Sequence, residues 1–373
     1  MNLRKTILYL IFLTLLLLPL WQMRTRHFKE PELTGAFTPH ERPEWNARDW
    51  FNGSYQTAYE QFINDSLGFH GQLVRLRNQF CFNVFHQTNA HNVVIGKDNY
   101  LFEQDYIDAH YGTDFIGLDS IRHMVIRTRR LQDSLAARGK TLVVFLSPSK
   151  ADFFPEYIPK SQQRDNTENT NYKQYSKLLK QYGVNVIDYN GFYQSQKSHT
   201  PYPLYAQYGI HWSEYGLIKA TDSLMHYIAQ KSGLTLPRIV IDRNVLIRQP
   251  QYSDYDLGKL LNLSDKPLPS YPLCYPEWHW TADTMSPKPT LTVISDSYYW
   301  EVYNLGIQQQ GFQGKFWYYN SSVYPESFTK ETFTHDLNIK EEIKKSDVIL
   351  IMSTTPGLRT FSWGAIDNLL KAL

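Results

Sequence analysis

The sequence predicts an α/β fold with a doubly wound parallel sheet of about five strands, flanking helices and an N-terminal membrane segment. Apolar segments near residues 141, 184, 291, 315 and 347 alternate with helical patterns, as the strands of such a sheet do. The segment from Thr141 to Leu146 is apolar almost throughout, which is typical of a strand buried on both faces. In these sheets the functional site lies beyond the carboxyl ends of the strands.

The membrane segment is predicted by the first residues. Arg4 and Lys5 precede an apolar run from Ile7 to about Met23, and two arginines follow it. This pattern fits either a cleaved signal peptide or a membrane anchor. We expect an uncleaved anchor over residues 1–27, because no small-x-small cleavage site follows the run directly.

The rest of the chain divides by composition. Residues 28–49 are rich in Pro, Glu, Arg and Thr without a period and are predicted to be a linker. We expect one globular domain over residues 50–373. Residues 234–288 interrupt its α/β pattern, and we interpret them as an inserted excursion or lid.

Composition limits the possible functions. The net charge of the 373 residues is +2, so nothing favours nucleic acid as a partner. The 27 Tyr, 20 Phe and 9 Trp suit either a large core or a sugar-binding cleft. Cys81 and Cys274 can form one disulfide or remain two free thiols. Two cysteines without a histidine cluster do not make a zinc site, and we expect no metal or cofactor.

The remaining elements follow in order. Residues 50–87 have a helical pattern in which Leu73, Leu76, Phe80 and Val84 form one stripe. Residues 92–102 predict a hairpin that turns at residues 96–99. We then expect helices from Asp119–Ser120, from about Tyr172 to Gly183, after Ser213 and around 337–345. The predicted strands are 141–146, 184–188, 291–295, about 315–319 and 347–352.

The segment around Ser297 carries the first candidate for chemistry. A buried strand ends in Ser295, Asp296 and Ser297, and an amphipathic helix is predicted from Tyr299 to about Gln310. A serine at such a turn has its hydroxyl at the carboxyl end of a strand, which suits a nucleophile. It is also a common helix cap, and both interpretations stay open on this segment alone.

Three further residues are predicted to reach the same edge of the sheet. His211 lies on a loop just before a helix that Ser213 can cap. Lys150 follows the strand at 141–146, and Asn320 follows the strand near 315. We therefore predict Ser297 as nucleophile and His211 as its base. Asn320 and Lys150 are predicted to contact the oxyanion or the substrate.

Several motifs resemble a known family. Gly-Ile-His-Trp-Ser at 209–213 and Ser-Asp-Ser at 295–297 are similar to motifs of the AlgX/AlgJ-type SGNH-hydrolase-like proteins of bacterial exopolysaccharide O-acetylation. Residues 94–102 resemble that family's "GKDGWLF" hairpin. Pro148-Ser149-Lys150 resembles its "P-x-K" segment, and residues 256–261 resemble its "DL…ML" stretch. The resemblance runs from about Trp50 to the end of the chain.

The resemblance implies an SGNH-type fold and a Ser-His-Asp site in which Ser297 and His211 match the family's serine and histidine. The family's aspartate has no counterpart, because its motif reads Asp-x-His-Trp and Gly209 stands in that place. The acid of such a triad fixes the tautomer of the histidine. Three outcomes remain: another carboxylate such as Glu214 or Asp188, a backbone carbonyl, or a degenerate site.

The resemblance also implies a function and a location. We expect an inner-membrane-anchored, periplasmic O-acetyltransferase that modifies hydroxyls of a polysaccharide, such as alginate, through an acetyl-serine. The implied partner is a membrane-bound O-acyltransferase that delivers acetyl groups. The alternatives are an acetyl esterase of the same fold, or a non-catalytic polysaccharide-binding subunit, which the loss of the acid at Gly209 would favour.

Overall fold

The computed structural model describes residues 3–35, 39–165, 168–281 and 287–373. The chain forms two compact units. The N-terminal unit comprises Met1–His91 and Leu257–Pro267, and the larger unit comprises Asn92–Asp256 and Leu268–Leu373. We expected one globular domain from residue 50, whereas the larger unit begins only at Asn92.

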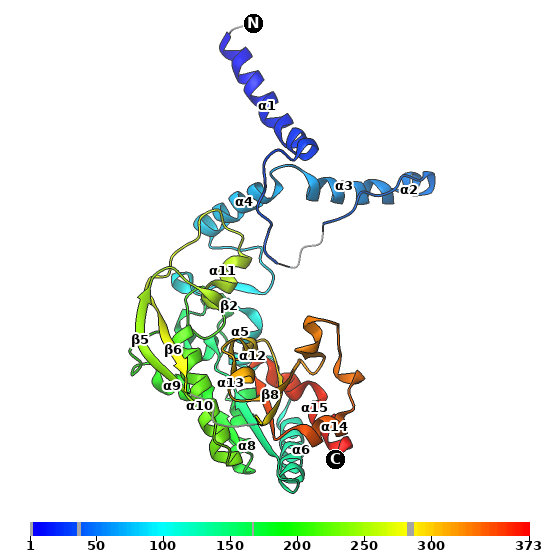
Figure 1. The fold of residues 1–373 in the computed structure, drawn as a ribbon. Coiled ribbons are helices and arrows are strands. Elements are labelled where there is room, and N and C mark those ends of the chain that lie inside the picture. Colours follow the sequence, from blue (N-terminus) through cyan, green and yellow to red (C-terminus); the bar gives the residue numbers. More distant parts are fainter. Residues whose placement is uncertain (1–2, 36–38, 166–167, 282–286) are drawn as a thin grey trace. The chain divides into compact units, whose positions relative to one another are not determined.

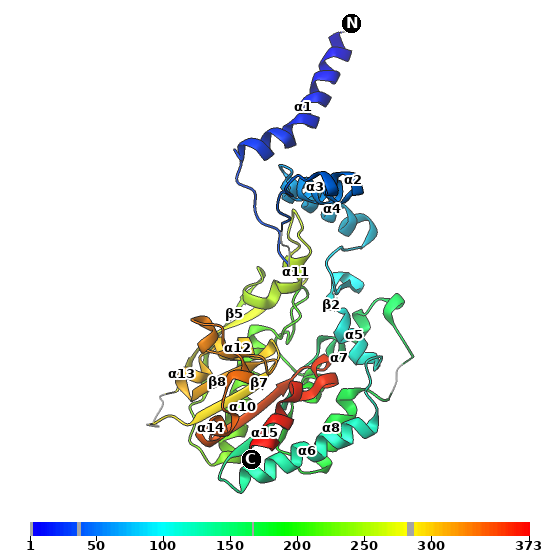
Figure 2. The ribbon, with the colours of Figure 1, turned by 90° about the vertical axis from the view of Figure 1, so that its right-hand side faces the viewer.

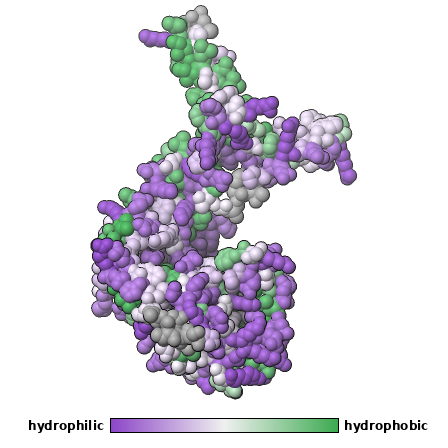
Figure 3. Space-filling view, in the orientation of Figure 1, coloured by the Kyte–Doolittle hydropathy of each residue, from purple (hydrophilic) through white to green (hydrophobic). Residues whose placement is uncertain are grey.

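The N-terminal unit consists of helices. The first, α1 (Leu3–Thr25), is long and apolar enough to cross a membrane by length and composition. Figure 3 shows apolar residues over this helix. The helical pattern of residues 50–87 is confirmed by α2 (Ala47–Asn52), α3 (Ser54–Ser66) and α4 (His70–Phe85). The apolar stripe of α4 is exposed, however, with Leu76 and Phe80 63% and 58% accessible, so its periodicity does not mark a core.

The larger unit, drawn mainly in cyan to red in Figure 1, is built on a six-stranded sheet with the order β4-β3-β10-β7-β8-β9. Five parallel strands confirm the predicted doubly wound sheet. A sixth strand, antiparallel to β8 at the edge, was not predicted. The strands are β3 (Thr141–Leu146), β4 (Val186–Asp188), β7 (Thr290–Ser295), β8 (Gln313–Tyr318), β9 (Ser322–Tyr324) and β10 (Val348–Ser353).

Helices cover both faces of this sheet. On one face, α6 (Leu118–Ala136), α8 (Asn171–Gln181), α14 (Ile339–Lys345) and α15 (Ala365–Ala372) enclose the main apolar core with alternate residues of β3 and β10. Figure 2 shows α6, α8 and α15 side by side. On the other face lie α9 (Tyr189–Gln196), α10 (Glu214–Ser232) and α12 (Tyr298–Asn304). Phe145 of β3 packs there on Tyr189, and Phe316 of β8 packs on Tyr299.

Shorter elements complete the larger unit. The predicted hairpin is confirmed as β1 (Val93–Ile95) paired with β2 (Leu101–Glu103). It leads into α5 (Gln104–Tyr111), and α7 (Lys150–Phe153) follows β3. The single helix predicted after Ser297 is instead two, α12 and α13 (Ile307–Gln310). They are separated at Gly306, whose φ of 86° interrupts a helix.

The predicted excursion at 234–288 contains a two-stranded antiparallel ribbon, β5 (Ile239–Ile247) and β6 (Leu273–Trp280). The sequence analysis did not predict this ribbon. Between its strands lie a 3-10 helix, η4 (Tyr252–Tyr255), and α11 (Asp256–Leu260). Residues 282–286 of the excursion lie outside the described residues.

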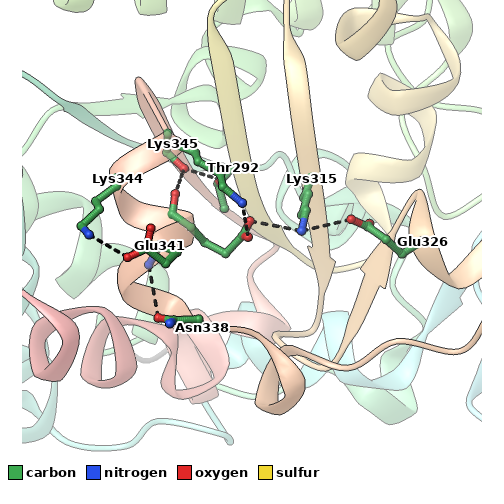
Figure 4. Close-up of polar contacts among 9 residues, drawn as sticks. Thr292, Lys315, Glu326, Asn338, Glu341, Lys344 and Lys345 are labelled. Carbon is green, nitrogen blue, oxygen red and sulfur yellow. Dashed lines mark hydrogen bonds and ion pairs between the residues drawn. The ribbon is translucent and has the colours of Figure 1, made fainter.

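A polar network holds the β8 edge of the sheet to α14 (Figure 4). The Lys315 ammonium of β8 lies 3.0 Å from the Glu326 carboxylate and 3.2 Å from that of Glu342. Asn338 caps α14, and the Thr292 and Ser346 hydroxyls are bonded at 2.6 Å. Lys315 thus ties β8 to α14, and the Thr292–Ser346 bond ties β7 to the residue after α14. The carboxyl ends of both strands border the candidate site.

The two cysteines are free thiols in the structure. Cys81 lies half-buried on α4, and Cys274 is buried on β6. Of the two alternatives left open by the sequence, the structure therefore has unpaired cysteines.

Candidate active site

The turn after β7 places Ser297 at the carboxyl edge of the sheet. Ser297 is the first residue flanking α12, but its side chain makes no capping hydrogen bond, and it is partly exposed. Its hydroxyl is therefore not used to cap the helix. Tyr298, the next residue, is buried, and its ring lies 4.7 Å from the ring of His211 between centroids. The turn that carries Ser297 is thus packed against the loop that carries His211.

A second contact joins the same two segments. The Tyr298 hydroxyl donates a hydrogen bond of 2.7 Å to the carbonyl of Ile210, directly before His211. Tyr298 is fully buried and takes part in both contacts, so they fix the relative position of the two segments within the larger unit.

Asp296 supports this turn from within. It is 3% exposed, and its carboxylate accepts hydrogen bonds from the backbone N–H groups of Tyr298 and Thr354 and from the Thr354 hydroxyl. Burial raises the pKa of Asp296, and the bonds from Thr354 oppose that shift. Since Thr354 follows the neighbouring strand β10, Asp296 joins two strand ends and is not the partner of His211.

His211 is held by the loop before α10. Ser213 caps that helix as predicted, accepting a 3.2 Å hydrogen bond from the N–H of Gly216. The Nδ1 atom of His211 lies 2.5 Å from Oδ2 of Asp256, the first residue of α11. The other oxygen of Asp256 accepts a 2.9 Å hydrogen bond from the N–H of Ile210. Asp256 therefore fixes both the backbone before His211 and the orientation of its ring.

The packing around Gly209 explains why the acid comes from a distant segment. A Cβ atom at Gly209 would lie 2.7 Å from the carbonyl oxygen of Ser253 and 3.2 Å from the Cα of Asp254. The η4 segment thus occupies the space that an aspartate side chain at position 209 would need. The same segment ends at Asp256, which reaches His211 from there.

Several carboxyl groups surround His211. Burial disfavours its protonated form, but the carboxylates of Glu301, Asp256 and Glu103 outweigh burial and raise the pKa of His211 to about 9. Burial also raises the pKa of Glu301, which lies one turn beyond Ser297 on α12. The pKa of Glu103 rises to about 7, first through burial and then through the charge of Asp256.

Lys150 has a different place from the one predicted. It is completely buried, and its ammonium donates hydrogen bonds to the carbonyls of Gln207 at 2.9 Å and Gly209 at 2.6 Å. Burial lowers the pKa of Lys150 to about 7, against the charges of Asp256 and Asp254. We expected Lys150 to contact the oxyanion or the substrate, whereas both of these bonds fix the backbone that leads to His211.

Asn320 is also engaged by the protein itself. Its amide nitrogen donates a 2.9 Å hydrogen bond to the carbonyl of Trp363. Its backbone has a φ of 50°, in the left-handed region, where the chain turns after β8. The amide expected at the oxyanion therefore ties the turn after β8 to the η7 segment (Pro356–Gly364).

The two carboxylates expected beside His211 lie elsewhere. Asp188 caps α9 through the N–H of Gly191 and accepts bonds from the side chains of Tyr172, Ser176 and Lys180. Glu214 opens α10, and burial followed by the charge of Glu301 raises its pKa to about 7. The carboxylate bonded to His211 is Asp256 and neither of these two.

Sequence reasoning missed the roles of Asp256, Tyr298 and Glu301. Asp256 stood inside the stretch at 256–261 that resembles the family motif, yet neither spacing nor periodicity connected it to His211. Among the described residues, no group of three or more His, Cys, Asp or Glu side chains could hold a metal ion. The arrangement at His211 is suited to acid–base chemistry through its second ring nitrogen, Nε2.

Comparisons with solved structures found related folds at low similarity. The O-acetyltransferase domain of Pseudomonas putida AlgJ is 18% identical with a TM-score of 0.47, covering 76% of this chain and all of that domain. Pseudomonas aeruginosa AlgX is 12% identical with a TM-score of 0.46, covering 75% and 68%. Bacillus cereus PatB1 with a sulfonyl adduct is 12% identical with a TM-score of 0.45, covering 74% and 99%.

A search among curated proteins found no relative. The family assignment therefore rests on a family model, described as the SGNH hydrolase-like domain of the acetyltransferase AlgX, that matches residues 93–275. This range includes Lys150, His211 and Asp256, whereas Ser297 lies beyond it. This match confirms the resemblance to the AlgX-type SGNH hydrolase-like proteins that was stated from the sequence.

Proposed function

We propose that this protein is an O-acetyltransferase that acetylates hydroxyl groups of an extracytoplasmic polysaccharide through an acetyl-Ser297 intermediate. The observation that carries the proposal is the 2.5 Å contact between His211 and Asp256. It supplies the acid whose absence at Gly209 was the reason for considering a non-catalytic subunit. The family model, named for an acetyltransferase, supports the acyl-transfer class of reaction.

The first half of the reaction acylates the serine. Asp256 accepts a hydrogen bond from the Nδ1–H group of His211, which leaves Nε2 unprotonated and able to act as the base. As the Ser297 oxygen attacks the acetyl carbonyl carbon, Nε2 takes the hydroxyl proton. The backbone N–H of Ser297 donates to the oxyanion. Collapse breaks the bond to the donor's leaving oxygen, which takes the proton from His211.

The second half transfers the acetyl group. A sugar hydroxyl attacks acetyl-Ser297 and gives its proton to His211, and the Ser297 oxygen leaves and regains that proton. Water in place of the sugar would give an esterase. The two reactions therefore differ only in the acceptor that reaches the acyl-enzyme.

The location and partner belong to the same proposal. The helix α1 supports anchoring in the inner membrane, with the larger unit in the periplasm. An acetyl donor must then reach Ser297 from the cytoplasm. We assign its delivery to a membrane-bound O-acyltransferase as the partner.

The decisive experiment is to trap the intermediate. The full chain, purified in detergent, is incubated with p-nitrophenyl acetate and digested for mass spectrometry. We expect acetyl on the peptide containing Ser297 in the wild type and in Ser321→Ala, an exposed serine beyond β8, but not in Ser297→Ala. Absence of acetyl-Ser297 in the wild type would refute the catalytic proposal.

A second stage separates the transferase from the esterase. Oligosaccharides are added to the trapped acyl-enzyme, and both products are measured. Acetylated sugar supports transfer, whereas release of acetate alone at an unchanged rate supports an esterase.

A further inference from the structure

Two aromatic side chains border Ser297 from different segments of the chain. Tyr319 follows β8 and is 41% exposed, and Trp363 lies in η7 and is partly exposed. Their ring centroids are 5.3 Å apart at an interplanar angle of 84°. The rings thus meet edge to face and form a corner with accessible aromatic surface.

Both aromatic residues lie close to the turn that carries Ser297. The N–H of Tyr319 donates a 2.8 Å hydrogen bond to the carbonyl of Ser295, two residues before Ser297. On the other side, a Cβ atom at Gly357 would lie 3.2 Å from a ring carbon of Trp363 and 3.2 Å from a carboxylate oxygen of Asp296. Gly357, which has no side chain, therefore lies close to both Trp363 and Asp296, the residue before Ser297.

The backbone at this corner is held in an unfavourable conformation. Tyr319, Asn320, Ser362 and Trp363 have φ values of 51°, 50°, 63° and 49°, all in the left-handed region. Bulky residues rarely adopt this region, and such outliers persist where surrounding structure enforces them, commonly at ligand sites. Here the hydrogen bond from the Asn320 amide to the Trp363 carbonyl joins the two strained turns.

We propose that Tyr319 and Trp363 form a subsite that stacks on a pyranose ring of the acceptor beside Ser297. An exposed aromatic face binds the C–H face of a sugar ring, and rings fixed in place lose little entropy on binding. The inference rests on the proposed function, since it names where the acceptor lies in that reaction. It also gives Asn320 a role as a positioning residue for the Trp363 loop.

Footprinting of the wild-type chain provides the first test and needs no variant to fold. The full chain in detergent is exposed to hydroxyl radicals with and without cellohexaose, chitohexaose or a mannuronan hexasaccharide. We expect one or more of these sugars to protect Tyr319 and Trp363 from oxidation. Phe328 is an aromatic residue that is 62% exposed and packs against Tyr324 of β9, and it should stay unprotected. Protection of neither residue by any of the three sugars would overturn the inference.

Substitutions provide the second test. Asparagine tolerates left-handed backbone, so Tyr319→Asn and Trp363→Asn remove the rings at little strain. We expect each to raise the Kd of the protecting sugar about threefold to tenfold, with Phe328→Asn as the matched control. Tyr319→Phe, which keeps the ring, should bind as the wild type does. Unchanged Kd values in both ring-removing variants would contradict the subsite.

The rate of Ser297 acetylation separates this inference from the proposed function. In Trp363→Asn the KM for the acceptor should rise by a larger factor than the rate of Ser297 acetylation falls, whereas Phe328→Asn should change neither. If Ser297 is acetylated normally but the KM for the acceptor is unchanged, the subsite is wrong and the function stands. If sugar protects the two rings but Ser297 is never acetylated, the function is wrong and the corner is a sugar-binding site alone.

Discussion

The Nδ1 atom of His211 lies 2.5 Å from Oδ2 of Asp256, which is 45 residues further along the chain. The residue that the family motif places two positions before the histidine is therefore replaced by one from another segment. The acid of a triad acts because its carboxylate oxygen lies beside the histidine, whatever its place in the sequence. Five predictions, on Asp256, Gly209, His211, Glu301 and Lys150, rest on this arrangement and its surroundings.

Asp256→Asn should abolish most of the catalysis without unfolding the protein. The amide cannot stabilise the imidazolium or keep the proton on Nδ1, so we expect the acetylation rate of Ser297 to fall about a thousandfold to ten-thousandfold. The burst of p-nitrophenolate in stopped flow measures this rate. Asp242→Asn is the matched control, because Asp242 pairs with His279 at 2.9 Å on the exposed ribbon. Equal rates in the two variants would remove Asp256 from the mechanism.

Gly209→Asp should not restore a family-like triad. Its Cβ would meet the carbonyl of Ser253 at 2.7 Å, so η4 must move and Asp256 with it. We expect a loss of stability of about 1–3 kcal/mol and a lower acetylation rate. Gly209→Ala should destabilise similarly, since the clash begins at Cβ. Thermal denaturation measures the first effect, and an active Gly209→Asp/Asp256→Asn double variant would show that this packing argument is wrong.

The acetylation rate should rise with pH through the pKa of His211. Its neutral form is the base, and the surrounding carboxylates raise its pKa to about 9, so the rate should increase from pH 7 until that value is passed. The groups facing it are Glu301 from α12, Asp256 from α11 and Glu103 from β2.

Removal of one of these charges should shift the rising limb of the pH–rate profile, which is the pH range in which the acetylation rate increases. Glu301→Gln lowers the pKa of His211, so the limb should shift to lower pH and the rate at pH 7 should increase about threefold to tenfold. Glu277→Gln, on the exposed ribbon beside Arg243, should leave the profile unchanged. A limb that stays in place in Glu301→Gln would mean that Glu301 does not act on the base.

Lys150→Met should destabilise the protein without changing how it binds substrates. The substitution removes the Lys150 donor from the buried carbonyl of Gly209, which costs about 1–3 kcal/mol, while the carbonyl of Gln207 keeps the N–H of Leu101. Denaturant unfolding measures the loss. At temperatures where the variant is folded, the KM for the acceptor should match that of the wild type. A raised KM with normal stability would instead return Lys150 to the substrate-contacting role predicted from the sequence.

The sequence by itself determined which elements form and at which edge of the sheet the candidate residues meet. Apolar runs without alternation gave the five parallel strands, and the parallel direction puts their carboxyl ends at one edge. Ser297 and His211 follow from that rule, because each lies on a turn or loop next to a helix start. The resemblance to the family came from short motifs, which can be recognised in the sequence without knowledge of the tertiary structure.

Only the tertiary structure decided which side chains of that edge act on each other. The periodicity of apolar residues indicates which side of a helix or strand is buried, but not which other segment packs there. It therefore could not show that η4 packs against Gly209 and brings Asp256 to His211. It could not show that Lys150 is buried against two carbonyls, or that the Asn320 amide bonds to Trp363 instead of facing the site. These contacts depend on the paths of loops between segments far apart in the chain, and a single sequence carries no periodic signal for such paths.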